Sequence, residues 1–197
     1  MILLSLLAPN KRCMIIAQQK RKENIAEYLL YMWQVEDLIR ANHFDIDLIE
    51  KNIIEGFDQP ESVRREMKEW YEHLIAMMLD EGVKEKGHIQ INKNVLIDLN
   101  DLHNRLLRMP KEAVYGSKFY QTLPFIIELR GKSGLQEEQN DIELCFNALY
   151  GYMLLRLQRK EVSQETIAAM KQISTFLALL AQKYKQVQTN ELSLDEE

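Results

Sequence analysis

The stretch QQKRKENIAEYLLYMWQVEDLIRA, residues 18–41, decides the fold class of this chain. No glycine or proline interrupts it. Its apolar side chains recur every three or four residues, as they do on one face of an α-helix. They are Ile25, Tyr28, Leu29, Met32, Val35 and Ile39. The spacing predicts one amphipathic helix over residues 18–41.

The same periodicity recurs along the rest of the chain. Its 197 residues include 7 Gly and 4 Pro, placed almost entirely where one amphipathic stretch gives way to the next. Further helices are predicted after the capping residue Asp45, after Asp58, over residues 92–108, from Ser117, over residues 137–160 and after Ser163. We therefore expect an all-α fold, a single-domain bundle of about six or seven helices.

The two ends of the chain differ in composition from the middle. The apolar run over residues 1–9 is too short to span a bilayer, and Met14 opens a more ordinary start. Residues 1–13 are predicted to be an N-terminal extension outside the fold, and residues 14–188 to form the helical domain. Residues 189–197 are polar and acidic and are predicted to be a solvated tail.

Composition narrows the classes of partner and the compartment. Hydrophobic residues make up 46% of the chain and charged residues 28%, which is typical of a soluble globular protein. A net charge of -5 gives no electrostatic reason to expect a nucleic acid, and we expect no membrane partner. Cys13 and Cys145 lie in unlike settings and form no disulfide framework, so the cytoplasm is the expected location.

No motif for catalysis, a cofactor or a metal ion is present. Carboxylate-bridged di-iron bundles need two Glu-x-x-His motifs, and the sequence holds a single one, Glu85 and His88. Gly131, Lys132 and Ser133 match the end of a P-loop, but Ile126 stands where the loop needs its first glycine. We predict no catalytic residue, cofactor or metal site from motifs, and leave open whether the protein is an enzyme.

Four polar side chains fall on predicted apolar faces and are expected to point at least partly inward. They are Glu36, His103, Arg130 and Arg156. In a structural interpretation, Glu36 bonds Arg40 within its helix or Arg156 across the core, since a buried charge needs a partner. Alternatively, the arginines and the histidine converge with tyrosines to bind a small anion. The candidate tyrosines are Tyr115, Tyr120 and Tyr152.

A second candidate site is an aromatic surface. The segment AVYGSKFYQTLPF, residues 113–125, holds Tyr115, Phe119, Tyr120 and Phe125. Amphipathic aromatic side chains are enriched at protein interfaces. These four rings are the candidate interaction patch, and the alternative is that they cover the core of their own helix.

Two segments resemble a known family. They are MIIAQQKRKENIAEYLLYMWQVEDLIRA, residues 14–41, and NDIELCFNALYGYMLLRLQRKEVSQET, residues 140–166. Both are similar to a family of Bacteroidetes proteins defined only as a domain of unknown function. The resemblance covers residues 14 to about 188 and implies a bacterial, cytoplasmic, helical protein. It brings no catalytic residue, ligand or partner.

Two classes of function follow from these observations. The first is a protein-interaction or adaptor module whose partner is another protein or a second copy of the chain. The second is a helical bundle that binds a small anion, or acts as an enzyme, through the Arg/Glu/His cluster. We rank the interaction module first.

Overall fold

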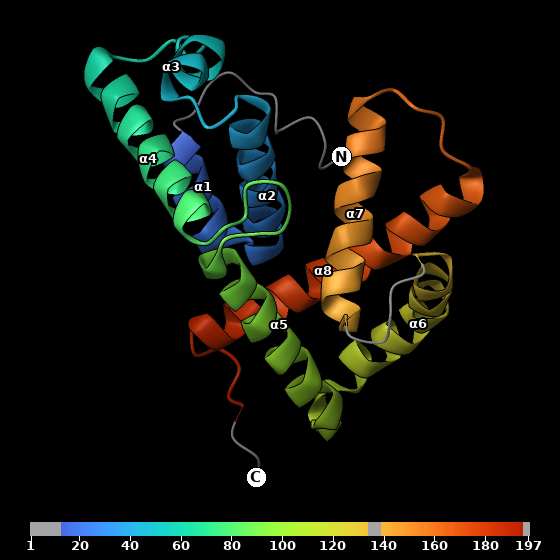
Figure 1. Cartoon of the computed structure of the whole chain (residues 1–197). Coiled ribbons are helices and arrows are strands. Elements are labelled where there is room, and N and C mark those ends of the chain that lie inside the picture. Colours follow the sequence, from blue (N-terminus) through green and yellow to red (C-terminus); the bar gives the residue numbers. More distant parts are fainter. Residues whose placement is uncertain (1–12, 134–138, 195–197) are drawn as a thin grey trace. The chain divides into compact units, whose positions relative to one another are not determined.

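The computed structural model of the chain describes residues 13–133 and 139–194 (Figure 1). Helices make up 80% of the structure, and the described residues contain no strand. The predicted all-α class is therefore confirmed. The described residues form eight α-helices rather than six or seven. Residues 1–12 of the predicted extension over residues 1–13, and the last three residues of the acidic tail, lie outside the described residues.

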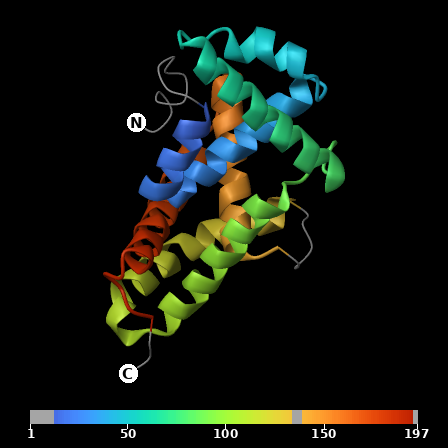
Figure 2. The same cartoon turned by 90° about the vertical axis from the view of Figure 1, so that its left-hand side faces the viewer.

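The chain divides into two compact units, Met1–Asn94 and Val95–Glu197, with the boundary inside α5 (Gln90–Arg108). The N-terminal unit contains α1 (Cys13–Glu23), α2 (Ile25–Ala41), α3 (Ile46–Ile49) and α4 (Glu61–Asp80), with a π-helix, η2 (Glu50–Ile54), after α3. Helices α1 and α2 lie side by side, and α4 packs against both (Figure 2). The buried core of this unit includes Leu29, Trp33, Ile39, Ile49, Met67 and Met78.

The helix predicted over residues 18–41 is two helices that meet at Asn24. The Asn24 backbone is extended, with φ of -155°. Its side-chain oxygen accepts hydrogen bonds from the backbone N–H groups of Ala26, at 3.1 Å, and Glu27, at 3.3 Å. Such a cap satisfies donors that have no partner within the helix. The prediction of one continuous helix is therefore wrong. The apolar spacing continues across Asn24 and gives no sign of the cap.

The C-terminal unit contains the remainder of α5, a 3₁₀ turn, η3 (Pro110–Glu112), and the helices α6 (Ala113–Ser133), α7 (Asp141–Leu157) and α8 (Gln164–Gln188). Helices α6, α7 and α8 all pack against one another. Their buried side chains include Tyr115, Cys145, Phe146, Ile173, Phe176 and Leu177. The aromatic rings of α6 and α8 thus form much of the core of this unit.

Several predicted helix limits are confirmed, and others shift. Asp45 caps α3 and Ser163 caps α8 through hydrogen bonds to backbone N–H groups. Helix α6 begins four residues before Ser117 and runs through Pro124. Proline removes the N–H that would bond the Tyr120 carbonyl. The Tyr120 and Pro124 side chains are both exposed, on the side of the helix where solvent can satisfy that carbonyl.

The cap at Asn24 leads to a prediction about stability. Replacing Asn24 with alanine should lower the free energy of unfolding by about 1 kcal/mol, because two backbone donors lose their acceptor. Urea denaturation followed by circular dichroism measures the change. The control is Asn94→Ala, which alters an exposed asparagine inside α5. Equal stability of the two variants would show that Asn24 does not act as a cap.

Candidate functional site

The Glu36 carboxylate of α2 is fully buried, as its place on an apolar face predicted. Its Oε1 accepts hydrogen bonds from the Ile89 backbone N–H, at 3.1 Å, and from Asn92 Nδ2, at 2.7 Å. Its Oε2 lies 2.5 Å from His88 Nδ1. The expected partners, Arg40 and Arg156, are not the ones that bind it. The segment at the start of α5 supplies these three contacts instead.

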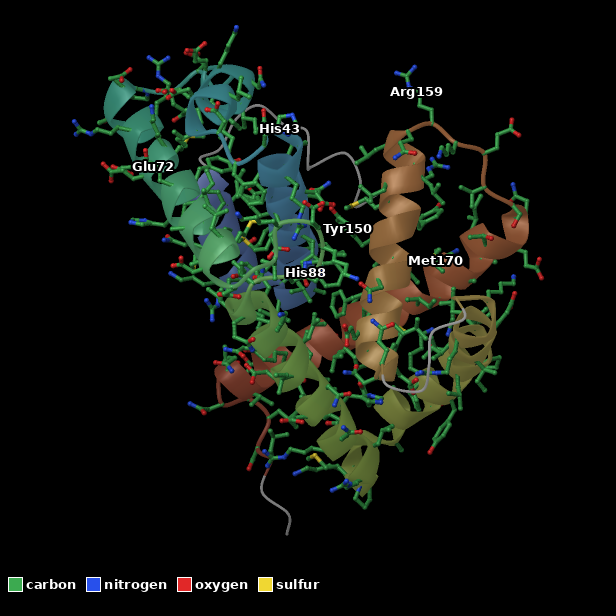
Figure 3. The ribbon with its side chains drawn as sticks, in the orientation of Figure 1. His43, Glu72, His88, Tyr150, Arg159 and Met170 are labelled. Atoms are coloured by element: carbon green, nitrogen blue, oxygen red, sulfur yellow. The ribbon has the colours of Figure 1, made fainter. Side chains whose placement is uncertain are left out.

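His88, which is labelled in Figure 3, has contacts on two sides in the N-terminal unit. One ring nitrogen contacts Glu36, and the ring stacks on the indole of Trp33. The two ring centroids are 4.1 Å apart and the planes differ by 9°. Aromatic stacking of this kind adds to the stabilisation that burial provides. His88 therefore links the core of α2 to the turn before α5.

Arg40, one turn after Glu36, binds the same turn. Its guanidinium donates to the backbone carbonyls of Val83, at 3.0 Å, Lys84, at 3.2 Å, and Gly87, at 2.5 Å. It also pairs with Asp37 at 2.8 Å. Arg40 thus uses its fork of donors to hold the backbone between α4 and α5.

Two carboxylates cap the start of α5. Glu36 accepts from the Ile89 N–H, and Glu81 accepts from the Gln90 N–H at 2.5 Å. Negative charge at a helix N-terminus is favourable, since the first N–H groups lack partners and the helix dipole is positive there. The Glu36 cluster is therefore accounted for as structural support of the α4–α5 connection.

His103 is buried in the C-terminal unit, as predicted, with 4% of its surface exposed. Its Nδ1 lies 2.7 Å from the Tyr115 hydroxyl, and its ring meets the rings of Phe119 and Phe176 edge to face. Burial lowers the pKa of His103 from 6.5 to about 4, although Asp141 acts in the opposite direction. Burial also raises the pKa of Tyr115. Both side chains are therefore uncharged near neutral pH.

Arg130 is half-buried and already paired. It donates to the Asp141 carboxylate at 2.7 Å and to the Gln139 carbonyl at 2.8 Å. Arg130 and His103 line one pocket of about 460 Å³ in the C-terminal unit. We call this the polar pocket, and its lining is Asn100, His103, Asn104, Arg130, Gln139, Asn140 and Asp141. The structure thus brings together two of the four polar residues singled out in the sequence.

The other two polar residues lie elsewhere. Glu36 belongs to the N-terminal unit, and the partners described above are in that same unit. Arg156 is exposed in the last turn of α7, so the expectation that it points inward is wrong. The apolar face of α7 stops being buried after Met153, since Leu155 and Leu157 are also exposed. The periodicity of α7 therefore overstates burial at its C-terminal end.

The candidate interaction patch is divided between core and surface. Tyr115 and Phe119 are buried, so the expectation that they lie on the surface is wrong. They point to the core because they occupy the inner face of α6, where they meet His103 and Phe176. Phe125 is half-buried, and Tyr120 has 65% of its surface exposed.

Sequence reasoning missed two exposed apolar residues on α6. Val114 is 78% exposed and Ile127 is 62% exposed. With Tyr120 they belong to what we call the outer face of α6, the exposed positions between residues 113 and 127. These positions are Ala113, Val114, Ser117, Tyr120, Gln121, Pro124 and Ile127, and none of them carries a charge. The sequence signal was there, because Lys118 is the single charged residue in this stretch.

Two hollows of the C-terminal unit adjoin this face. One, of about 800 Å³, lies where α5, η3 and α6 meet, and Tyr120 is part of its lining. The other, of about 640 Å³, lies between α6 and α8, and Val114 is part of its lining. Ala113, Ser117 and Gln121 line both. The outer face of α6 is therefore an uneven, uncharged surface on which Val114, Tyr120 and Ile127 are the large exposed apolar side chains.

Other chemistry finds little support in the described part of the chain. The described residues hold no group of three or more His, Cys, Asp or Glu side chains that could bind a metal ion. Within the same residues, no helix has the length and apolar character needed to cross a membrane. Cys145 is buried, and burial raises the pKa of its thiol to about 12, so little reactive thiolate forms at neutral pH.

Glu36, which is buried, and Arg156, which is exposed, allow a matched test of how burial affects stability. Glu36→Ala should lower the free energy of unfolding by roughly 3 to 5 kcal/mol, because a buried Asn92 amide and the start of α5 lose their acceptor. Arg156→Ala should change it by less than about 0.5 kcal/mol, since the side chain is exposed. Urea denaturation measures both. A small effect of Glu36→Ala would contradict the structural role of the cluster.

The lowered pKa of His103 should make the stability of the protein depend on pH. Its pKa is about 4 in the folded protein and near 6.5 in the unfolded chain, so the unfolded state takes up the proton first as pH falls. Stability should therefore decrease between pH 6.5 and 4, by about 3 kcal/mol from this group alone. The control is His103→Gln, which lacks a titrating ring. Parallel pH profiles for the two proteins would refute a buried, neutral His103.

Comparison with known proteins places the chain in a family. No curated protein and no solved structure matches it. The family model described as "Domain of unknown function (DUF4924)" matches residues 14–191 and so includes α2, α5, α6 and the polar pocket. The chain belongs to the DUF4924 family.

Proposed function

We propose that this protein is a helical interaction module that associates with a second copy of itself through the outer face of α6. The observation that carries the proposal is the absence of charge among the exposed positions 113–127, together with the exposure of Val114, Tyr120 and Ile127. Contiguous exposed apolar surface is typical of sites that bind other proteins. The aromatic ring of Tyr120 is of the kind that anchors such interfaces.

The composition of other helix surfaces in the chain makes this face distinctive. Helix α4 exposes Glu61, Arg65, Glu66, Glu69 and Glu72, as expected of a solvated helix. Glu72 is labelled in Figure 3. Charged residues make up 28% of the whole chain. The exposed positions of these four helical turns carry no charge, and the charged residue among them is half-buried Lys118, in the lining of the hollow between α6 and α8. This composition differs from that of α4 in the direction that favours association.

A second copy can bind through this face because the exposed positions there carry no charge. Each chain carries a net charge of -5, so two copies repel one another over most of their surfaces. In a two-fold dimer the same surface meets itself, and an uncharged surface does so without opposing like charges. The two hollows beside α6 can receive the protruding side chains of the other copy.

Binding of a small anion by the Arg/Glu/His cluster has less support. Arg130 is paired with Asp141, and Arg156 is exposed. Glu36 is itself an anionic group held by protein donors. The cluster therefore lacks the unpaired positive charge that an anion site needs.

A bacterial, cytoplasmic setting completes the proposal. It is supported by the resemblance of residues 14–41 and 140–166 to Bacteroidetes proteins, and by the lack of a disulfide framework. Immunodetection in fractionated bacterial cells tests the location. Recovery in the periplasmic fraction would contradict it.

Self-association is tested by sedimentation velocity over micromolar to millimolar concentrations. The wild-type protein should shift toward a dimer as concentration rises. Tyr120→Glu should stay monomeric, because burying a charge opposite its own copy is unfavourable. The control is Ile97→Glu, at an apolar position of α5 that is 53% exposed and flanked by the exposed, charged residues Lys93, Asp98 and Asp101.

Two results would contradict the proposal. A wild-type protein that stays monomeric at every concentration would exclude self-association. Equal dimerisation of wild type and Tyr120→Glu, with Ile97→Glu as the weaker variant, would place the interface on another face.

A further inference from the structure

The polar pocket of the C-terminal unit is separate from the outer face of α6 and is built from a different kind of residue. The described side chains that line it are all polar, and they come from α5, from α6, and from the start of α7 with the two residues before it. Its volume of about 460 Å³ lies within the range of small-molecule sites. The pocket therefore suits a small ligand held by hydrogen bonds.

His103 presents a hydrogen-bond donor to this pocket. Among the described residues, the Tyr115 hydroxyl has His103 Nδ1 as its hydrogen-bond partner, at 2.7 Å. A buried hydroxyl proton needs an acceptor, so the hydroxyl donates and Nδ1 accepts. In a neutral imidazole the proton then resides on Nε2. His103 lines the pocket as a fixed, uncharged N–H donor.

Among the described residues, the side chains that line the pocket carry no net formal charge at neutral pH. Arg130 and Asp141 form an ion pair at 2.7 Å, which cancels their charges. The other lining side chains are His103, which is neutral, and four carboxamides. A phosphate or carboxylate would gain little Coulomb energy here and would have to displace water from its own charge. An uncharged ligand avoids that cost.

Carboxamides dominate the remaining chemistry. Each amide side chain offers an oxygen acceptor and an NH₂ donor side by side. One of these acceptors, Gln139 Oε1, is buried and has no hydrogen-bond partner among the described residues. Such an unpaired atom lowers stability unless a ligand or water supplies a donor. A ligand with adjacent N–H and C=O groups matches these side chains reciprocally.

We propose that the polar pocket binds an uncharged small molecule of the amide class, held by His103, Gln139 and the amide side chains of Asn100 and Asn104. The ring N–H and the asparagine NH₂ groups donate to the carbonyl of the ligand. The Gln139 oxygen accepts from its N–H. This proposal is independent of self-association through α6, because it rests on other residues.

The test is a titration of ¹⁵N-labelled full-length protein with size-matched probes, followed by NMR chemical shifts. Acetamide and uracil represent the amide class, glucose represents polyols, and acetate and inorganic phosphate represent anions. The amide probes should shift signals of residues around His103. Asn104→Ala should weaken their binding about tenfold, as loss of a hydrogen-bonded amide does. Asn104 is exposed at the edge of the pocket, so this variant should fold.

A substitution outside the polar pocket should leave binding of the amide probes unchanged. The matched control, Asn94→Ala, removes an exposed asparagine from the same helix and should leave binding within twofold of wild type. Tighter binding of phosphate or acetate would show that the pocket selects anions, and tighter binding of glucose would show that it selects polyols. No binding of either amide probe, or equal binding by Asn104→Ala and wild type, would overturn the assignment.

Discussion

The buried carboxylate of Glu36 is the interaction on which the N-terminal unit depends. A carboxylate removed from water must receive hydrogen bonds, and here the segment from His88 to Asn92 donates them. The turn between α4 and α5 must therefore close against α2, where Arg40 binds three of its carbonyl groups. One pair of charged residues on α2 thereby sets where α5 begins.

Helix α5 then continues into the C-terminal unit, where a different balance operates. His103 is buried without a charged partner and stays neutral, bonded to Tyr115 and surrounded by aromatic rings. The inner face of α6 supplies Tyr115 and Phe119 to that core. Its outer face has neither charge nor cover within the described residues, and this contrast between the two faces of one helix supports an interaction module.

Local patterns predicted the helices, and long-range contacts account for most of the errors. Apolar spacing and the caps Asp45 and Ser163 predict helices because both act within a few residues. The same spacing hid the break at Asn24, where a cap interrupts an unbroken apolar face. The partners of Glu36 lie more than 50 residues away in sequence, which no periodicity encodes. Burial of Tyr115 and exposure of Tyr120 depend on which face of α6 meets α8.

The central claim, association through the outer face of α6, is tested most directly by hydrogen–deuterium exchange at low and high protein concentration. The account predicts that peptides covering Ala113–Ile127 exchange more slowly at high concentration, while peptides from α4 exchange at the same rate. Unchanged exchange across α6, or slowing confined to another helix, would contradict the claim.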